Sequence, residues 1–91
     1  MAIVIRARVP GMTPETYERM SVQLLEQIRK QKGFVAHAGV AIPGGIEVTE
    51  FWESQEAFDA WIKGTVLPAS TAAGLPVPIL EVAPALRVQL K

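Results

Sequence analysis

Apolar and polar residues alternate at the start of the chain, from Ala2 to Val9. A period of two is typical of a β-strand with one face on the core. The predicted core face carries Ile3, Ile5, Ala7 and Val9. The opposite face carries Val4, Arg6 and Arg8.

Three further stretches have strand character. They are Phe34–Ile42, Ile46–Glu53 and Ile79–Leu90. Pro84 interrupts the last stretch, which predicts an edge strand or a bulge.

Between the first two strands, apolar residues recur at helical spacing. Thr13 is a suitable N-cap for this helix, Pro14 fits its first turn, and Gly33 suits its C-terminal stop. The inner stripe consists of Tyr17, Met20, Ser21, Leu24 and Ile28. We expect the Tyr17 hydroxyl to reach water at the end of its ring.

A second helix is predicted from Gln55 to Lys63, with Ser54 as its N-cap and Gly64 as its end. The stretch from Thr65 to Ala73 is ambiguous, because Pro68 can break a short further helix there. Residues 74–78 contain two prolines and are expected to be irregular.

The predicted order of elements is β-α-β-β-α-β over a single domain of residues 1–91. This order indicates an α+β, ferredoxin-like fold, in which an antiparallel sheet has both helices on one face. The other face still presents apolar side chains, so a second subunit is expected to cover it in a homodimer. The part of the last strand beyond Pro84 is expected to reach toward that partner.

The turn between the second and third strands predicts a register. If Gly44-Gly45 is a two-residue hairpin loop, the numbers of paired residues sum to about 89. His37 then lies opposite Trp52, and Gly39 lies opposite Glu50. The side chains of His37, Glu50 and Trp52 are therefore predicted to share one face of the sheet.

Composition narrows the classes of function. Nine basic residues balance nine acidic ones, which argues against nucleic acid or an anionic membrane as partner. The chain has no cysteine, which excludes disulfides and thiol catalysis. One histidine and scattered carboxylates make no metal site of known spacing. No apolar run approaches the roughly 18 residues of a membrane span, so a cytoplasmic location is expected.

His37 and Glu50 are the candidate catalytic residues. Imidazole titrates near neutral pH, and a neighbouring carboxylate can orient it as a proton acceptor. The alternative is a histidine that is hydrogen-bonded and inert. Trp52 and Trp61 are candidates for an aromatic wall around a planar ligand, and the alternative for both is core packing.

Arg6 and Arg8 are candidates for binding a carboxylate or phenolate, because guanidinium offers a planar fork of donors. The alternative places them in ion pairs at a dimer interface or in solvent.

Three features together resemble the antibiotic biosynthesis monooxygenase-like family. They are Gly33-Phe34, the Gly44-Gly45 hairpin, and the run Glu50-x-Trp52-Glu53-Ser54-x-Glu56-Ala57-Phe58 at the strand–helix junction. The resemblance implies a dimeric α/β barrel. It also implies a cofactor-independent oxygenase acting on a phenolic or polyketide-like molecule.

Two activities of that family can be compared with this chain. The quinone-forming monooxygenases use an asparagine and a tryptophan near the substrate, and this chain has no asparagine. The haem-degrading branch has a run like Trp52 to Trp61 followed, nine residues on, by a histidine that binds iron. Ser70 stands at that position here, which disfavours haem degradation.

Two functions remain open. The first is an oxygenase or a related enzyme on a small aromatic ligand, without a cofactor. The second is a non-catalytic ligand-binding protein or a structural dimer. A cleft above roughly 300 Å³ between sheet and helices favours a ligand, and a filled interior favours the structural dimer.

Overall fold

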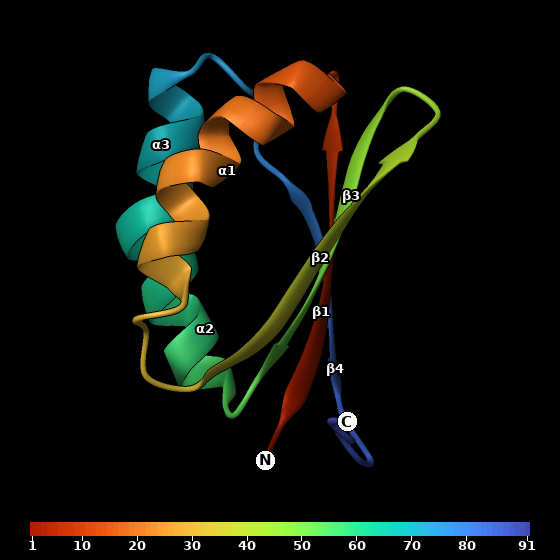
Figure 1. Ribbon diagram of the computed structural model, residues 1–91, viewed down its shortest axis with the longest axis vertical. Helices are drawn as coiled ribbons and strands as arrows, with labels where there is room; N and C mark the ends of the chain where they lie inside the picture. The colour runs from red at the N-terminus through yellow and green to blue at the C-terminus, as the bar shows by residue number, and fades with distance from the viewer.

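The computed structural model describes residues 1–91. The chain folds into a four-stranded sheet with its helices on one face (Figure 1). The strands are β1 (Ile3–Pro10), β2 (Phe34–Ile42), β3 (Gly45–Trp52) and β4 (Ile79–Pro84). Their order in the sheet is β2-β3-β1-β4, and all neighbouring strands are antiparallel. The predicted α+β, ferredoxin-like fold is confirmed.

The two helix starts follow from their capping residues. Helix α1 (Pro14–Ile28) begins after Thr13, whose hydroxyl accepts a hydrogen bond from the Thr16 N–H at 3.2 Å. Helix α2 (Gln55–Trp61) begins after Ser54, whose hydroxyl accepts from the Ala57 N–H at 3.2 Å. Both hydroxyls pair an N–H that the first helical turn leaves free.

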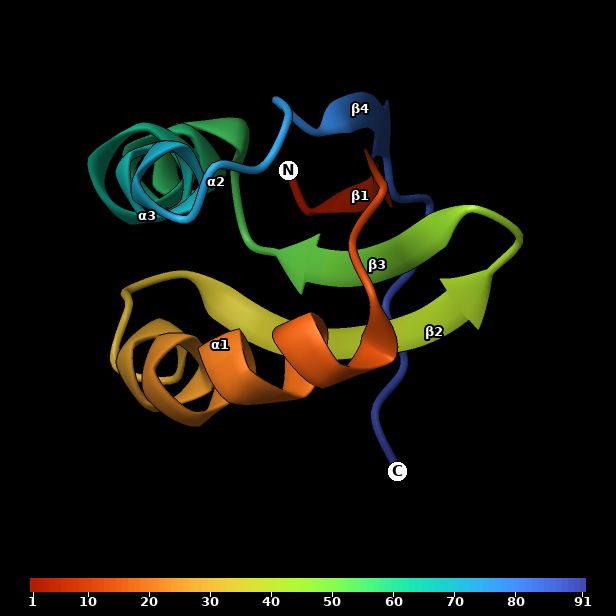
Figure 2. The same cartoon turned by 90° about the horizontal axis from the view of Figure 1, so that it is seen from above.

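The second helix does not end at Gly64, and the prediction of its end was wrong. The chain continues through a π-helical turn (Ile62–Val66) into helix α3 (Leu67–Ala72). Pro68 lies in the first turn of α3, where its missing N–H costs little. Helices α2 and α3 therefore form one rod beside α1, seen end-on in Figure 2.

The hairpin between β2 and β3 differs from the predicted register. Pro43 and Gly44 form the two-residue loop, because proline suits its first position and Gly44, with φ of +80°, suits its second. Ile42 therefore pairs with Gly45, and His37 pairs with Glu50 rather than with Trp52. Gly39, in turn, pairs with Val48 rather than Glu50.

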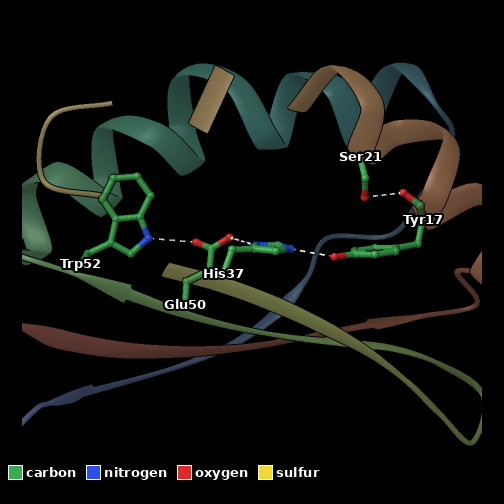
Figure 3. A network of polar contacts seen from close by, with 5 residues as sticks. All are labelled: Tyr17, Ser21, His37, Glu50 and Trp52. Carbon is green, nitrogen blue, oxygen red and sulfur yellow. Dashed lines mark hydrogen bonds and ion pairs between the residues drawn. The ribbon is translucent and has the colours of Figure 1, made fainter. Parts of the chain in front are cut away.

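The shift is two residues, and a two-residue shift keeps every side chain on its face. The prediction that His37, Glu50 and Trp52 share one face is therefore confirmed, and that face is the one beneath the helices (Figure 3). A bulge near Val35 brings Phe34 opposite Trp52, where the two rings meet edge to face.

The core lies between the sheet and the helices. Trp52 is completely buried at its centre, in contact with Phe58 and Trp61. Strand β4 is an edge strand, as Pro84 predicts. It ends at Pro84, so the prediction of a strand that continues to Leu90 was wrong. The opposite face of the sheet carries no helix (Figure 1). None of the helices has the length and apolar character needed to span a bilayer.

Candidate functional site

A cavity of about 100 Å³ lies between the sheet and the helices. Fifteen of its 20 lining residues are hydrophobic. Its hydroxyl, imidazole and carboxylate groups come from Tyr17, Ser21, His37, Glu50 and Ser70. An apolar lining with a few converging polar groups is typical of small-molecule sites, although those sites usually enclose roughly 300–1,000 Å³.

Three polar side chains at this cavity, those of Tyr17, His37 and Glu50, form one chain of hydrogen bonds with the buried Trp52 (Figure 3). The Tyr17 hydroxyl lies 2.7 Å from His37 Nε2, and His37 Nδ1 lies 2.8 Å from Glu50 Oε2. Behind them, Trp52 Nε1–H donates to Glu50 Oε1 at 2.9 Å. All these distances are those of well-formed hydrogen bonds.

One assignment of protons satisfies every member of the chain. An ionised Glu50 accepts from Trp52 and from His37 Nδ1–H, and the neutral imidazole then accepts the Tyr17 O–H at Nε2. We assign this tautomer because Nδ1 faces a carboxylate. The donors therefore run in one direction, from Tyr17 to Glu50.

Strand pairing and one glycine place these groups. His37 and Glu50 are directly opposite on β2 and β3, which brings their side chains within reach. Tyr17 comes from α1 and lies over Gly39, where the Cβ of any other residue would overlap its hydroxyl and ring. Because Gly39 has no side chain, the Tyr17 ring can lie against the sheet and reach His37.

The Tyr17 and His37 rings lie almost in one plane, with 7° between them and 6.2 Å between their centres (Figure 3). The hydroxyl therefore meets Nε2 from the edge of the imidazole. Burial raises the pKa of Tyr17 above its ordinary value, and the carboxylates of Glu18 and Glu50 add to that effect. The phenol thus keeps its proton at neutral pH and can donate it to Nε2.

The sequence missed three features of this site. Tyr17 was expected to reach water, and its hydroxyl instead bonds His37. Gly39 and Ser70 were considered only for the strand register and for the haem comparison, and not as parts of this site. A tyrosine within an apolar helix stripe, and a glycine two residues from the only histidine, are the signals in the sequence that point to the first two.

The two tryptophans have different positions. Trp61 lines the cavity and is 3% exposed, so it fits the predicted wall as well as the core. Trp52 does not line the cavity, because it is fully buried behind Glu50. Its contact with the site is the hydrogen bond from its indole N–H.

Arg6 and Arg8 lie away from the cavity. They alternate along β1 with cavity-lining residues, so they project from the opposite face of the sheet. Arg6 pairs with Glu47 at 3.4 Å, and Arg8 pairs with Glu81 at 3.2 Å. The structure therefore does not bring the two arginines together with His37. They form ion pairs, as in the alternative to the predicted ligand-binding role.

The site has no donor set for a metal. No group of three or more histidine, cysteine, aspartate or glutamate side chains comes together in the structure. Ser70 stands where the haem-degrading branch of the family has its iron-binding histidine. It is buried on α3 and lines the cavity. Its hydroxyl is a poor ligand for iron in comparison with imidazole.

Neither a protein-family model nor a curated protein matches this sequence. Solved structures, however, share its fold. SnoaB, a cofactor-independent oxygenase from Streptomyces nogalater, superposes with a TM-score of 0.68 at 16% identity over 99% of this chain and 97% of its own. A protein of unknown function from Nitrosomonas europaea gives 0.74 at 17% identity, over 99% of this chain and 94% of that one.

A third similar structure is a MhuD mutant with two manganese protoporphyrin IX molecules bound per active site. Its TM-score is 0.68 at 20% identity, and the likeness covers 100% of both chains. At these identities the likeness concerns the fold alone. It confirms the resemblance to the fold of the antibiotic biosynthesis monooxygenase-like proteins.

Proposed function

We propose that this protein binds a small phenolic or polyketide-like molecule in the cavity and, as a cofactor-independent oxygenase, removes a proton from it. The observation that carries the proposal is the hydrogen-bonded chain from Tyr17 to Glu50 at the wall of an apolar cavity. A partly buried histidine that is hydrogen-bonded to a carboxylate is a suitable proton acceptor.

The reaction needs molecular oxygen as its only co-reactant. The His37–Glu50 pair accepts a proton from an activated CH₂ group, and the carbanion formed adds to O₂ to give a peroxide anion. The peroxide takes up a proton, and loss of the second C–H proton then breaks the O–O bond. One oxygen atom ends in a new carbonyl group and the other in water.

Three groups have defined roles in this proposal. Glu50 holds the Nδ1–H of His37, so that Nε2 is the basic nitrogen, and it stabilises the imidazolium that forms. Trp52 fixes the second oxygen of that carboxylate. Trp61 offers an aromatic surface for a flat ligand on the helical side of the cavity.

A second candidate function is that of a structural dimer or a ligand-binding protein without catalysis. The cavity volume favours the structural dimer, since about 100 Å³ is below the roughly 300 Å³ expected of an open ligand cleft. The absence of asparagine also separates this chain from the quinone-forming enzymes that the sequence resembles.

We also propose a homodimer that packs the bare sheet faces together. The support is the sheet face without helices, which carries exposed Val40 and Ile79 beside two arginine–glutamate pairs. Light scattering after size-exclusion chromatography tests this directly, and a strictly monomeric protein at micromolar concentration would refute it.

Two measurements test the function. Native mass spectrometry of the freshly purified protein should show a co-purifying small molecule if the cavity binds one. Oxygen uptake with hydroxylated polycyclic ketones should then be lost in His37→Gln, which keeps a side chain of similar polarity without the base. Uptake that is equal in His37→Gln excludes the proposed oxygenase and leaves the binding function.

A further inference from the structure

In the hydrogen-bonded chain, the Tyr17 hydroxyl occupies the basic nitrogen of His37. Both ring nitrogens of His37 are already occupied, one by Tyr17 and the other by Glu50. A ligand in the cavity therefore meets no free lone pair on the imidazole. Each Glu50 oxygen keeps a lone pair, but each is also held by a hydrogen bond, from His37 or from Trp52.

The Tyr17 oxygen keeps lone pairs after its hydroxyl has donated to Nε2, since a phenol oxygen accepts as well as donates. Tyr17 lines the cavity together with His37, and its oxygen meets the edge of the imidazole at Nε2. The Tyr17 ring lies against Gly39. A side chain added at position 39 would overlap the ring and displace it.

Resting on the proposed function, we infer that Tyr17 is the catalytic residue that meets the ligand, and that it relays the ligand's proton to His37. The ligand is then one with an acidic hydroxyl group, a phenol or the enol form of the CH₂ ketone, because loss of that hydroxyl proton gives the same carbanion that adds to O₂ in the proposed function. Its proton passes to the Tyr17 oxygen while the Tyr17 proton passes to His37 Nε2. The products are a bound phenolate or enolate, a neutral Tyr17 and an imidazolium beside the Glu50 carboxylate.

This relay makes His37 a positioning residue and the final proton acceptor. The raised pKa of Tyr17 agrees with it, because the phenol stays protonated until a ligand supplies a second proton. Gly39 becomes a determinant of the site, since only glycine lets Tyr17 reach Nε2.

The test uses 4-nitrophenol, whose phenolate absorbs visible light, so binding and ionisation are read without turnover. We expect the wild-type protein to raise the phenolate fraction several-fold over the same buffer near neutral pH. In Tyr17→Phe, which opens Nε2 to the cavity, that increase should be lost. If Tyr17→Phe binds 4-nitrophenol and ionises it as well as the wild type, His37 acts directly and the relay is wrong.

Further variants separate the relay from the proposed function. Gly39→Ala, which displaces Tyr17, should lower the phenolate fraction as Tyr17→Phe does. Thr71→Ala removes an exposed hydroxyl from the same helix α3, outside the cavity lining, and should leave the fraction unchanged. A wild-type protein that shows no spectral change with 4-nitrophenol overturns both the proposed phenol site and the relay that rests on it. Melting temperatures confirm that each variant is folded.

Discussion

The two faces of the sheet use carboxylates in different ways. Under the helices, Glu50 is 6% exposed and forms hydrogen bonds at 2.8 and 2.9 Å with His37 and Trp52. On the bare face, Arg8 and Glu81 meet at 3.2 Å with about half of each side chain in water. Burial strengthens a polar contact and makes its loss expensive, whereas water weakens an exposed ion pair.

The comparison supports the proposal that the inner face carries the function. A buried polar group must have its partners, so the inner residues hold one another in a single arrangement. The exposed arginines can exchange their glutamate partners for water at little cost. Chemistry that needs a proton acceptor in a defined position is therefore expected at His37, and the outer face is suited to association.

The largest effect on stability should come from removing Glu50. Glu50→Ala leaves the Trp52 indole N–H and one His37 nitrogen without partners inside the core, so we expect a loss of about 2–5 kcal/mol. Urea unfolding measures it. The matched control is Glu47→Ala on the bare face, with an expected loss below about 1 kcal/mol. Equal losses in the two variants would remove the distinction between the faces.

Gly39→Ala should have the next largest effect. The added methyl overlaps the Tyr17 hydroxyl and ring, and overpacking of this kind costs about 1–3 kcal/mol. Gly64→Ala is the control, because a Cβ there meets no atom within 4 Å. We expect no loss of stability in the control. An unchanged unfolding midpoint in Gly39→Ala would show that Tyr17 is not held against the sheet.

The pH dependence of stability reports on the inner face through Tyr17, the only tyrosine. Its pKa is raised in the folded protein from the ordinary value of 10.0. The folded chain therefore keeps this proton when the unfolded chain has already lost it. The resulting contribution is fully present below pH 10 and is lost as pH rises through the folded pKa.

Tyr17→Phe removes that contribution, so its stability should fall less steeply than that of the wild type above pH 10. Urea unfolding at a series of alkaline pH values measures the difference. Phenolate absorbance of the wild type gives the folded pKa independently. A constant difference in stability between the two proteins across that range would mean that burial does not perturb Tyr17.

The fold was predictable from the sequence because its signals are local. Thr13 and Ser54 mark the helix starts, and the alternation along β1 identifies both faces of the sheet. The hairpin register was off by two residues, since Pro43-Gly44 and Gly44-Gly45 both fit a two-residue loop and only the backbone φ of Gly44 distinguishes them.

The candidate site was partly predictable for a related reason. His37 and Glu50 lie on adjacent strands, and an even error in register leaves their face unchanged. Tyr17 belongs to a different element, and its contact with His37 depends on how closely α1 approaches the sheet over Gly39. That distance is a property of tertiary packing, which periodicity in the sequence does not contain.

The smallest expected effect concerns the bare face. A double-mutant cycle with Arg8→Ala and Glu81→Ala should give a coupling of about 0.2–1 kcal/mol in dilute protein, because both side chains are about half exposed. The coupling should shrink as salt is added, since ions screen exposed charges. If a second copy covers this face, the coupling should grow with protein concentration, because the pair is then buried in the dimer. A coupling that exceeds about 2 kcal/mol at every concentration would contradict the exposed environment of Arg8 and Glu81.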